Sequence, residues 1–131
     1  MKNLLFTLAL LVSFSSFGQT SDEYFNSAYD KDDNGDYYGA ISDYTKSIEL
    51  NPDANTYYNR GISKRKLKDY NGAIADHTKV IELNPNYTDA YFSRGLSKSD
   101  LKDLTGACAD WKKAASLGYT NSAEWVANQC N

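Results

Sequence analysis

The segment with the sequence DKDDNGDYYGAI, residues 30–41, combines residue types that could bind a metal ion. A calcium-binding loop uses oxygen ligands at its first, third and fifth positions and a glycine at its sixth. These positions are held here by Asp30, Asp32, Asn34 and Gly35. The twelfth position should be a glutamate that binds through both oxygens, but it is Ile41. The sequence therefore leaves a weak calcium site at Asp30, Asp32 and Asn34 as an alternative only.

Residue combinations typical of catalysis are scarce. Ser63 and Lys66 match a serine–x–x–lysine motif, but the companion motifs of that enzyme class are missing. His77 is the only histidine, and no cysteine pair lies near it to complete a metal site. No pair of catalytic carboxylates, nucleophile elbow or phosphate-binding loop stands out. We therefore expect no enzymatic activity, no cofactor and no small-molecule substrate.

The N-terminal residues match a secretory signal peptide. Lys2 is followed by an apolar run over residues 4–12 and by small residues at Ser16 and Gly18. The apolar run is shorter than the roughly 20 residues that span a bilayer, so a retained membrane anchor is the less favoured alternative. We expect residues 1–18 to be removed and residues 19–131 to be exported to the periplasm or beyond the cell.

Export affects how the charge and the cysteines are interpreted. Removing Lys2 from the 14 basic residues leaves 13 against 17 acidic ones, a net charge of −4. An acidic chain without a basic stripe is a poor binder of nucleic acid or of an anionic membrane surface.

Cys108 and Cys130 lie eleven residues before and after Tyr119, so a turn there would bring them together. Outside the cytoplasm, such a pair predicts a disulfide rather than a metal site.

The chain repeats itself with a period of 33 or 34 residues, which indicates stacked structural units. Each unit has an aromatic residue, a small residue four positions later, an aspartate that can cap the start of the second helix, and an alanine. These are Tyr24, Ala28, Asp36 and Ala40; Tyr57, Gly61, Asp69 and Ala73; and Tyr91, Gly95, Asp103 and Ala107. Helical spacing of the apolar residues predicts helix pairs at about 22–33 and 37–50, 55–67 and 70–83, and 89–101 and 104–117. A further helix is expected near 122–129.

Several side chains have expected roles in these pairs. His77 occupies the position of Tyr44 and Trp111 in the other units, so we expect it to pack in the core. We also expect ion pairs between Arg60 and Asp76 and between Arg94 and Asp110. The first unit has Ser27 opposite Asp43 and cannot form this pair.

This pattern resembles the tetratricopeptide repeat family, in particular its small secreted bacterial members. The resemblance implies an all-α fold, a right-handed α-solenoid. Its three helix pairs would cover about residues 21–53, 54–87 and 88–121, and a C-terminal cap helix would cover about 122–129. The first helices of successive repeats would line a concave groove that binds peptides.

The resemblance also implies which residues line the groove. The expected lining residues are Phe25, Tyr29, Tyr58, Asn59, Ile62, Arg65, Lys66, Phe92 and Leu96. We expect Tyr58 and Phe92 to carry most of the affinity, and Arg65 and Lys66 to select an acidic residue of the ligand. The competing interpretation is that the rings pack on one another and only stiffen the array. Of the residues with which some relatives clamp a terminal carboxylate, only Asn59 is matched.

These observations predict an exported module that binds another protein or a peptide. The alternative is a structural or self-associating component of an envelope assembly, with no separate ligand. A monomer is favoured, and a homodimer is left open.

Overall fold

The structure is a computed structural model that describes residues 18–131, so the expected signal peptide at 1–18 falls almost entirely outside the described part. That part forms seven α-helices and contains no β-strand. They are α1 (Ser21–Asp33), α2 (Tyr37–Leu50), α3 (Ala54–Lys66), α4 (Tyr70–Leu83), α5 (Thr88–Asp100), α6 (Leu104–Ser116) and α7 (Thr120–Gln129). The all-α solenoid of three helix pairs with a final helix is thereby confirmed. None of the described helices is long and apolar enough to cross a membrane.

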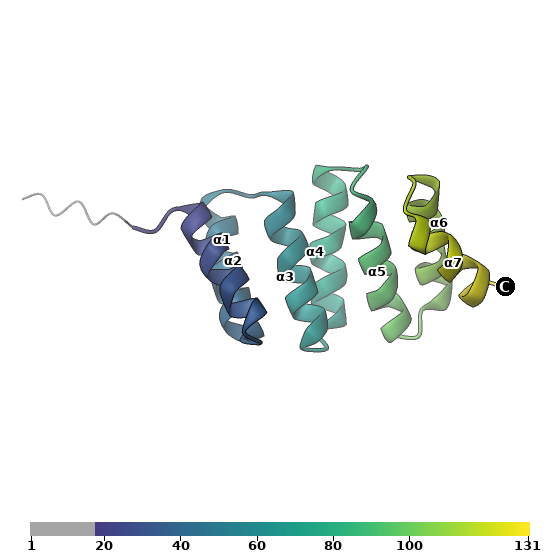
Figure 1. The fold of residues 1–131 in the computed structure, drawn as a ribbon, viewed down its shortest axis with the longest axis horizontal. Coiled ribbons are helices and arrows are strands. Elements are labelled where there is room, and N and C mark those ends of the chain that lie inside the picture. Colours follow the sequence, from purple (N-terminus) through teal and green to yellow (C-terminus); the bar gives the residue numbers. More distant parts are fainter. Residues whose placement is uncertain (1–17) are drawn as a thin grey trace, which may run out of the picture.

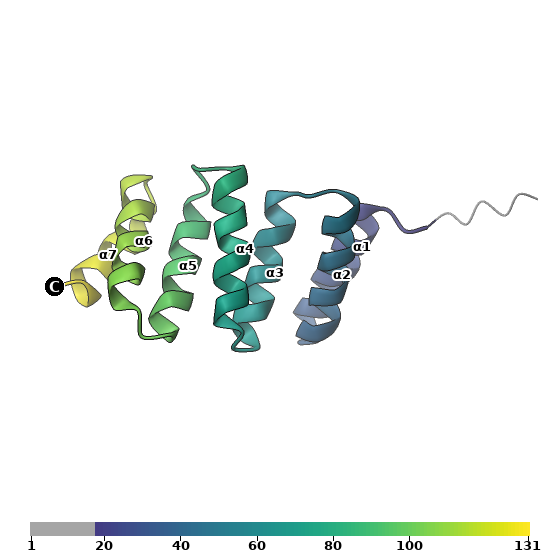
Figure 2. The same ribbon diagram turned by 180° about the vertical axis from the view of Figure 1, so that it is seen from behind.

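The helices form two layers of an elongated array. Helices α1, α3, α5 and α7 lie toward the viewer in Figure 1, and α2, α4 and α6 lie toward the viewer in Figure 2. Each first helix contacts the second helix of its own pair, and each second helix contacts the next first helix. Because the units stack in one direction, a residue at a given repeat position recurs along the same face of the array.

The turns inside the helix pairs end at the aspartates of the repeat. Asp36, Asp69 and Asp103 each precede a second helix, and each side chain accepts a hydrogen bond from the backbone N–H three residues later. Lys68 and Lys102 have positive φ angles of 63° and 67° in these turns. The first unit has a glycine, Gly35, in the corresponding turn, where φ is 82°. Its presence in the calcium-like segment is therefore explained by the backbone of the turn.

Small residues on the first helices make room for large residues on the second helices. Trp111, Tyr44 and His77 are fully buried at equivalent positions, which confirms the packing role expected for His77. A Cβ atom added to Gly61 would lie 2.7 Å from Nε2 of His77. A side chain at this position would therefore collide with His77, which explains the glycine.

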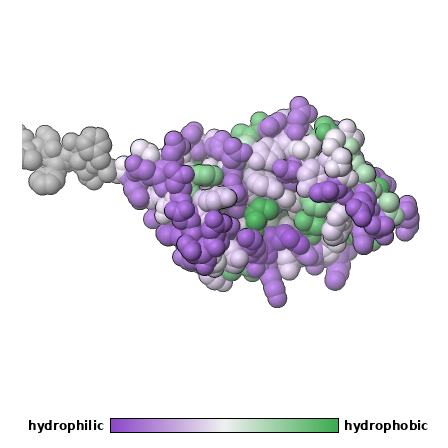
Figure 3. Space-filling view, viewed as in Figure 1, coloured by the Kyte–Doolittle hydropathy of each residue, from purple (hydrophilic) through white to green (hydrophobic). Residues whose placement is uncertain are grey.

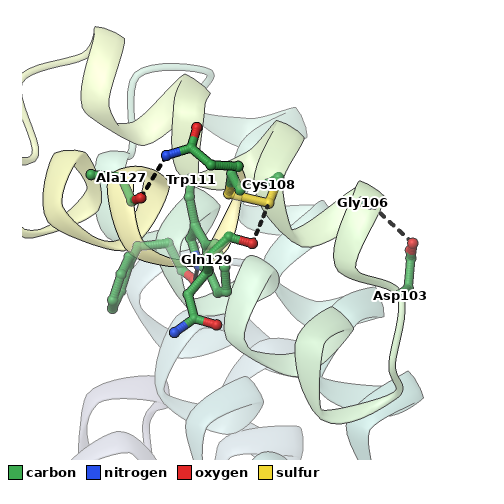
Figure 4. The surroundings of a disulfide bond; sticks show 9 residues. Asp103, Gly106, Cys108, Trp111, Ala127 and Gln129 are labelled. Atoms are coloured by element: carbon green, nitrogen blue, oxygen red, sulfur yellow. Dashed lines mark hydrogen bonds between the residues drawn. A yellow bond between two sulfur atoms is a disulfide. The ribbon is translucent and has the colours of Figure 1, made fainter.

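A disulfide between Cys108 and Cys130 ties α7 to α6 (Figure 4). The Cα atoms of the two cysteines are 5.7 Å apart, and the bond closes a segment of 22 residues. The Trp125 ring of α7 also lies 5.0 Å from the Trp111 ring of α6, centroid to centroid. The last helix is thus held both covalently and by aromatic packing, which suits a helix that covers the end of an array.

Candidate functional site

The first-helix face is the surface presented by α1, α3, α5 and α7. Figure 3 shows this face with apolar atoms exposed near its centre, over α3 and α5, and with hydrophilic residues around them. All nine residues expected from the sequence to bind a ligand belong to α1, α3 and α5. Eight of them fall into three groups according to what each side chain contacts, and the ninth, Asn59, is described with the carboxylate-clamp positions.

The first group consists of rings that fill the array itself. The Tyr58 ring lies 5.4 Å from the His77 ring and 5.3 Å from the Tyr87 ring, between centroids. Burial raises the pKa of the Tyr58 hydroxyl, which lies 3.3 Å from Ser93 Oγ. This packing supports the competing interpretation for Tyr58, in which its ring stiffens the array.

Phe92 and Phe25 belong to the same group. The Phe92 ring lies 4.9 Å from the Tyr119 ring and 5.9 Å from the Trp125 ring, so the cap helix contacts it. Phe25 packs 5.7 Å from the Tyr44 ring. These contacts link each first helix to its own second helix or to the next first helix. Replacing such a ring would disturb folding as well as any binding.

The second group is an apolar strip that runs across three repeats. Tyr29 is 50% exposed, and Ile62 and Leu96 are partly exposed. They occupy one repeat position on α1, α3 and α5, so the units present them in a row. This apolar strip of Tyr29, Ile62 and Leu96 is the part of the expected site that a partner can reach without displacing a core side chain.

The third group is the basic pair, and both of its members are already paired with carboxylates. Arg65 Nε donates to Asp100 on α5 over 2.7 Å, and Lys66 Nζ lies 3.5 Å from Asp32 on α1. Lys66 also lies over the Tyr37 ring. The two cations therefore link adjacent first helices. These pairs could not be predicted from the sequence, because the partners are 34 or 35 residues away.

The residues at the carboxylate-clamp positions do not form a basic pocket. Asn59 Nδ2 donates to the backbone carbonyl of Asn55, one turn earlier on the same helix. The clamp's basic residues are replaced by Phe25, Asp89 and Ser93. Of these, Phe25 and Ser93 are engaged in the packing described above, and Asp89 would repel a terminal carboxylate.

The expected ion pairs inside the hairpins are confirmed. Arg60 binds Asp76 with two hydrogen bonds of 2.9 and 2.7 Å, and Arg94 binds Asp110 in the same way over 2.9 and 2.6 Å. Both aspartates are buried. A second cation contacts each aspartate, Lys64 in one unit and Lys98 in the other. These lysines were not anticipated from the sequence.

In the first unit a serine and a lysine replace the arginine. Ser27 donates to Asp43 over 2.7 Å, and Lys31 donates to the same oxygen over 2.6 Å. Burial opposes the ionised form of Asp43, but these hydrogen bonds and the nearby Lys46 hold the pKa of its carboxyl below the usual value. The buried aspartate is therefore satisfied in all three units.

The residues of the possible calcium site do not form a loop around a common point. Asp30 and Asp32 lie in the last turns of α1, and Asn34 donates its side-chain amide to the backbone carbonyl of Asp30. Asp32 accepts a hydrogen bond from Ser63 over 2.6 Å. Among residues 18–131, no group of three or more histidine, cysteine, aspartate or glutamate side chains is placed to hold a metal ion. The positions of Asp30 and Asp32 are explained by helix α1, which contains both, and by the hydrogen bond from Ser63 to Asp32, without a bound ion.

His77 lies beneath the first-helix face and has an unusual environment. Neither ring nitrogen has a hydrogen-bond partner among the described residues. Burial lowers the pKa of His77 to about 4, although the backbone of Tyr58 and the Asp76 carboxylate act in the opposite direction. The ring is therefore neutral at physiological pH and serves as a packing group.

Comparisons with known proteins agree on one family. The sequence model of the tetratricopeptide repeat matches residues 54–87, and a second model of the same repeat matches residues 23–53. Among curated proteins, no sequence matches the chain significantly.

Solved structures show the same architecture. The first TPR of Spaghetti (RPAP3), bound to an HSP90 peptide, superposes with a TM-score of 0.80 at 25% identity, covering 86% of this chain and 91% of that one. The TPR2B domain of yeast Sti1, in a complex with pHsp70, gives 0.75 at 27% identity, with 83% and 91% covered. The Arabidopsis OM64 TPR domain gives 0.79 at 24%, with 83% and 92% covered, and shows the fold alone. Together, the repeat matches, the seven-helix array and these similarities identify this chain as a tetratricopeptide repeat protein.

Proposed function

We propose that this chain is an exported interaction module that binds an extended segment of another protein along the first-helix face. The observation that carries the proposal is the apolar strip of Tyr29, Ile62 and Leu96. It crosses three repeats and is at least partly accessible, while the neighbouring rings are used for packing. An extended segment gains affinity by covering such a strip, because apolar area is removed from water.

Similar structures support a peptide ligand. The first TPR of Spaghetti (RPAP3) is bound to the HSP90 peptide SRMEEVD, and the yeast Sti1 domain is in a complex with pHsp70. Residues at the carboxylate-clamp positions differ in this chain, so the proposal concerns peptide binding in general and not a chaperone tail. Export is supported by the Cys108–Cys130 disulfide, because disulfides persist in oxidising compartments, and by the sequence of residues 1–18.

Site-specific photo-crosslinking tests the proposal. A photoreactive phenylalanine analogue replaces Tyr29 on the first-helix face or, as the matched control, Tyr38 on α2, which is 77% exposed. In cells of the native host, the Tyr29 derivative should capture a partner protein that the Tyr38 derivative does not. A peptide from the captured segment should then bind the purified chain, and Ile62→Ala should weaken that binding.

Two outcomes would contradict the proposal. Equal capture by both derivatives would move the interaction away from the first-helix face. Capture of a second copy of this chain, together with a dimer in sedimentation experiments, would establish the self-associating alternative.

A further inference from the structure

The charges around the apolar strip are not balanced. Five carboxylates of α1, α5 and α7 form no ion pair or hydrogen bond with any residue of the described part: Asp22, Asp30, Asp33, Asp89 and Glu124. The two basic residues of the expected ligand-binding set, Arg65 and Lys66, are engaged by Asp100 and Asp32. The other basic residues of α1, α3 and α5 pair with the buried aspartates of the second helices. The face therefore presents a net negative charge to an incoming ligand.

One edge of the face has no basic residue in its sequence. The N-terminal half of each first helix and the residues before it, 18–30, 51–59 and 84–93, contain no lysine or arginine. Asp22, Asp53 and Asp89 lie at the starts of α1, α3 and α5, which share this edge (Figure 1). The exposed Lys68 and Lys102 lie in the turns beyond the opposite ends of these helices.

A hollow between α1, α2 and α3 opens at the same edge. It is lined by Ser21, Asp22, Phe25, Ser47, Asn51, Asp53, Asn55 and Thr56. Two carboxylates, several neutral polar groups and one aromatic ring thus surround a space that no basic residue lines. These groups can accept hydrogen bonds from a lysine ammonium or an arginine guanidinium, and the ring can pack against the aliphatic part of such a side chain.

The helix N-termini at this edge do not cancel the negative charge. A helix start carries roughly half a positive charge, which favours an aspartate in the first turn but offsets only part of its full negative charge. Asp89 also acts at a distance: burial is the main cause of the raised pKa of the Tyr58 and Tyr87 hydroxyls, and the Asp89 charge adds to it. The field over the edge therefore favours a cationic group in the ligand.

On the basis of this charge complementarity, we propose that the first-helix face binds an extended segment that combines apolar side chains with lysine or arginine. The inference rests on the proposed function, because it specifies the partner for the same apolar strip. It reverses the expectation that Arg65 and Lys66 select an acidic ligand, since both cations are engaged within the array. The ligand class differs from the SRMEEVD peptide bound by the first TPR of Spaghetti (RPAP3).

Two synthetic peptides of equal length test the inference. They share their leucine and tyrosine residues, and every polar position is lysine in one and glutamate in the other. Fluorescence anisotropy with the purified chain should show binding of the lysine peptide, weakening as NaCl is added, and no binding of the glutamate peptide. Asp89→Lys should weaken binding of the lysine peptide by roughly tenfold at low salt.

Glu49→Lys is the matched control. It makes the same charge change on α2, where Glu49 is exposed and lies opposite the helix face that carries the buried Ala40, Tyr44 and Ile48. Binding of the lysine peptide should be almost unchanged in this variant. An equal loss in the Glu49→Lys and Asp89→Lys variants would overturn the inference, because it would show a general effect of net charge.

The remaining outcomes separate the inference from the proposed function. Preferential binding of the glutamate peptide, lost in Ile62→Ala, would overturn the cationic preference and leave peptide binding on this face in place. Binding of neither peptide, in a chain whose circular dichroism is that of a folded helical protein, would overturn both. Binding of the lysine peptide that is unaffected by Ile62→Ala would also contradict both, because the apolar strip would then take no part.

Discussion

Replacing His77 with phenylalanine should remove a large part of the acid sensitivity of this fold. The His77 side chain is fully buried, and neither nitrogen has a hydrogen-bond partner among residues 18–131. Its pKa is lowered from 6.5 to about 4 by burial. As the pH falls below 6.5, the unfolded chain therefore binds a proton that the folded chain does not, and stability is lost until the pH reaches the folded-state pKa.

The magnitude follows from the same shift. A difference of one pKa unit corresponds to about 1.4 kcal/mol, so the full loss is roughly 3 kcal/mol, and about 2 kcal/mol of it should appear by pH 5. Urea denaturation of the natural chain and of His77→Phe, followed by circular dichroism at several pH values from about 7.5 to 4.5, measures it. The comparison uses the slope of the unfolding free energy against pH, so a constant cost of fitting the larger ring does not affect it. Parallel curves for the two proteins would refute the reasoning.

Three further predictions concern the contacts that hold the array. Cys130→Ser should destabilise α7 by about 3 kcal/mol, according to the chain-entropy description of a loop closed over 22 residues. Faster amide hydrogen exchange confined to α7 would show this loss of stability. Arg94→Ala should lower the unfolding free energy by about 3 kcal/mol, because the buried Asp110 loses the partner that binds it with two hydrogen bonds. A change below about 1 kcal/mol in urea titrations would mean that Lys98 alone is enough to stabilise the Asp110 carboxylate. Gly61→Ala should cost about 1–3 kcal/mol, since the added methyl would collide with His77, and an unchanged thermal midpoint would contradict this.

Helix positions could be predicted from the sequence because the repeat supplies the same signals three times. Asp36, Asp69 and Asp103 precede three second helices, and the described helices begin and end within two residues of the expected limits. A capping box formed by Thr20 and Glu23 is also present at the start of α1. Local capping and helical periodicity depend on residues close in sequence, which is why these features were accessible.

The candidate site was harder to predict, because the position of a residue in the repeat does not specify which neighbours cover its side chain. Tyr58 and Ile62 lie one helical turn apart, yet the first packs against His77 and Tyr87 and the second belongs to the accessible strip. The Arg65–Asp100 pair joins residues 35 positions apart on different units. Such contacts depend on the stacking geometry between repeats, which the pattern within one repeat does not contain.

The arginine of the second and third repeats acts between units as well as within them. Arg60 Nη1 donates to Thr45 on the preceding second helix over 3.0 Å, and Arg94 makes the same contact with Thr78 over 3.2 Å. One guanidinium therefore joins the buried aspartate of its own hairpin to the hairpin before it. No described helix precedes α1, so an arginine at position 27 would have no such threonine to reach. Ser27 and Lys31 satisfy Asp43 without this bridge, which gives a physical reason for the departure of the first unit from the repeat.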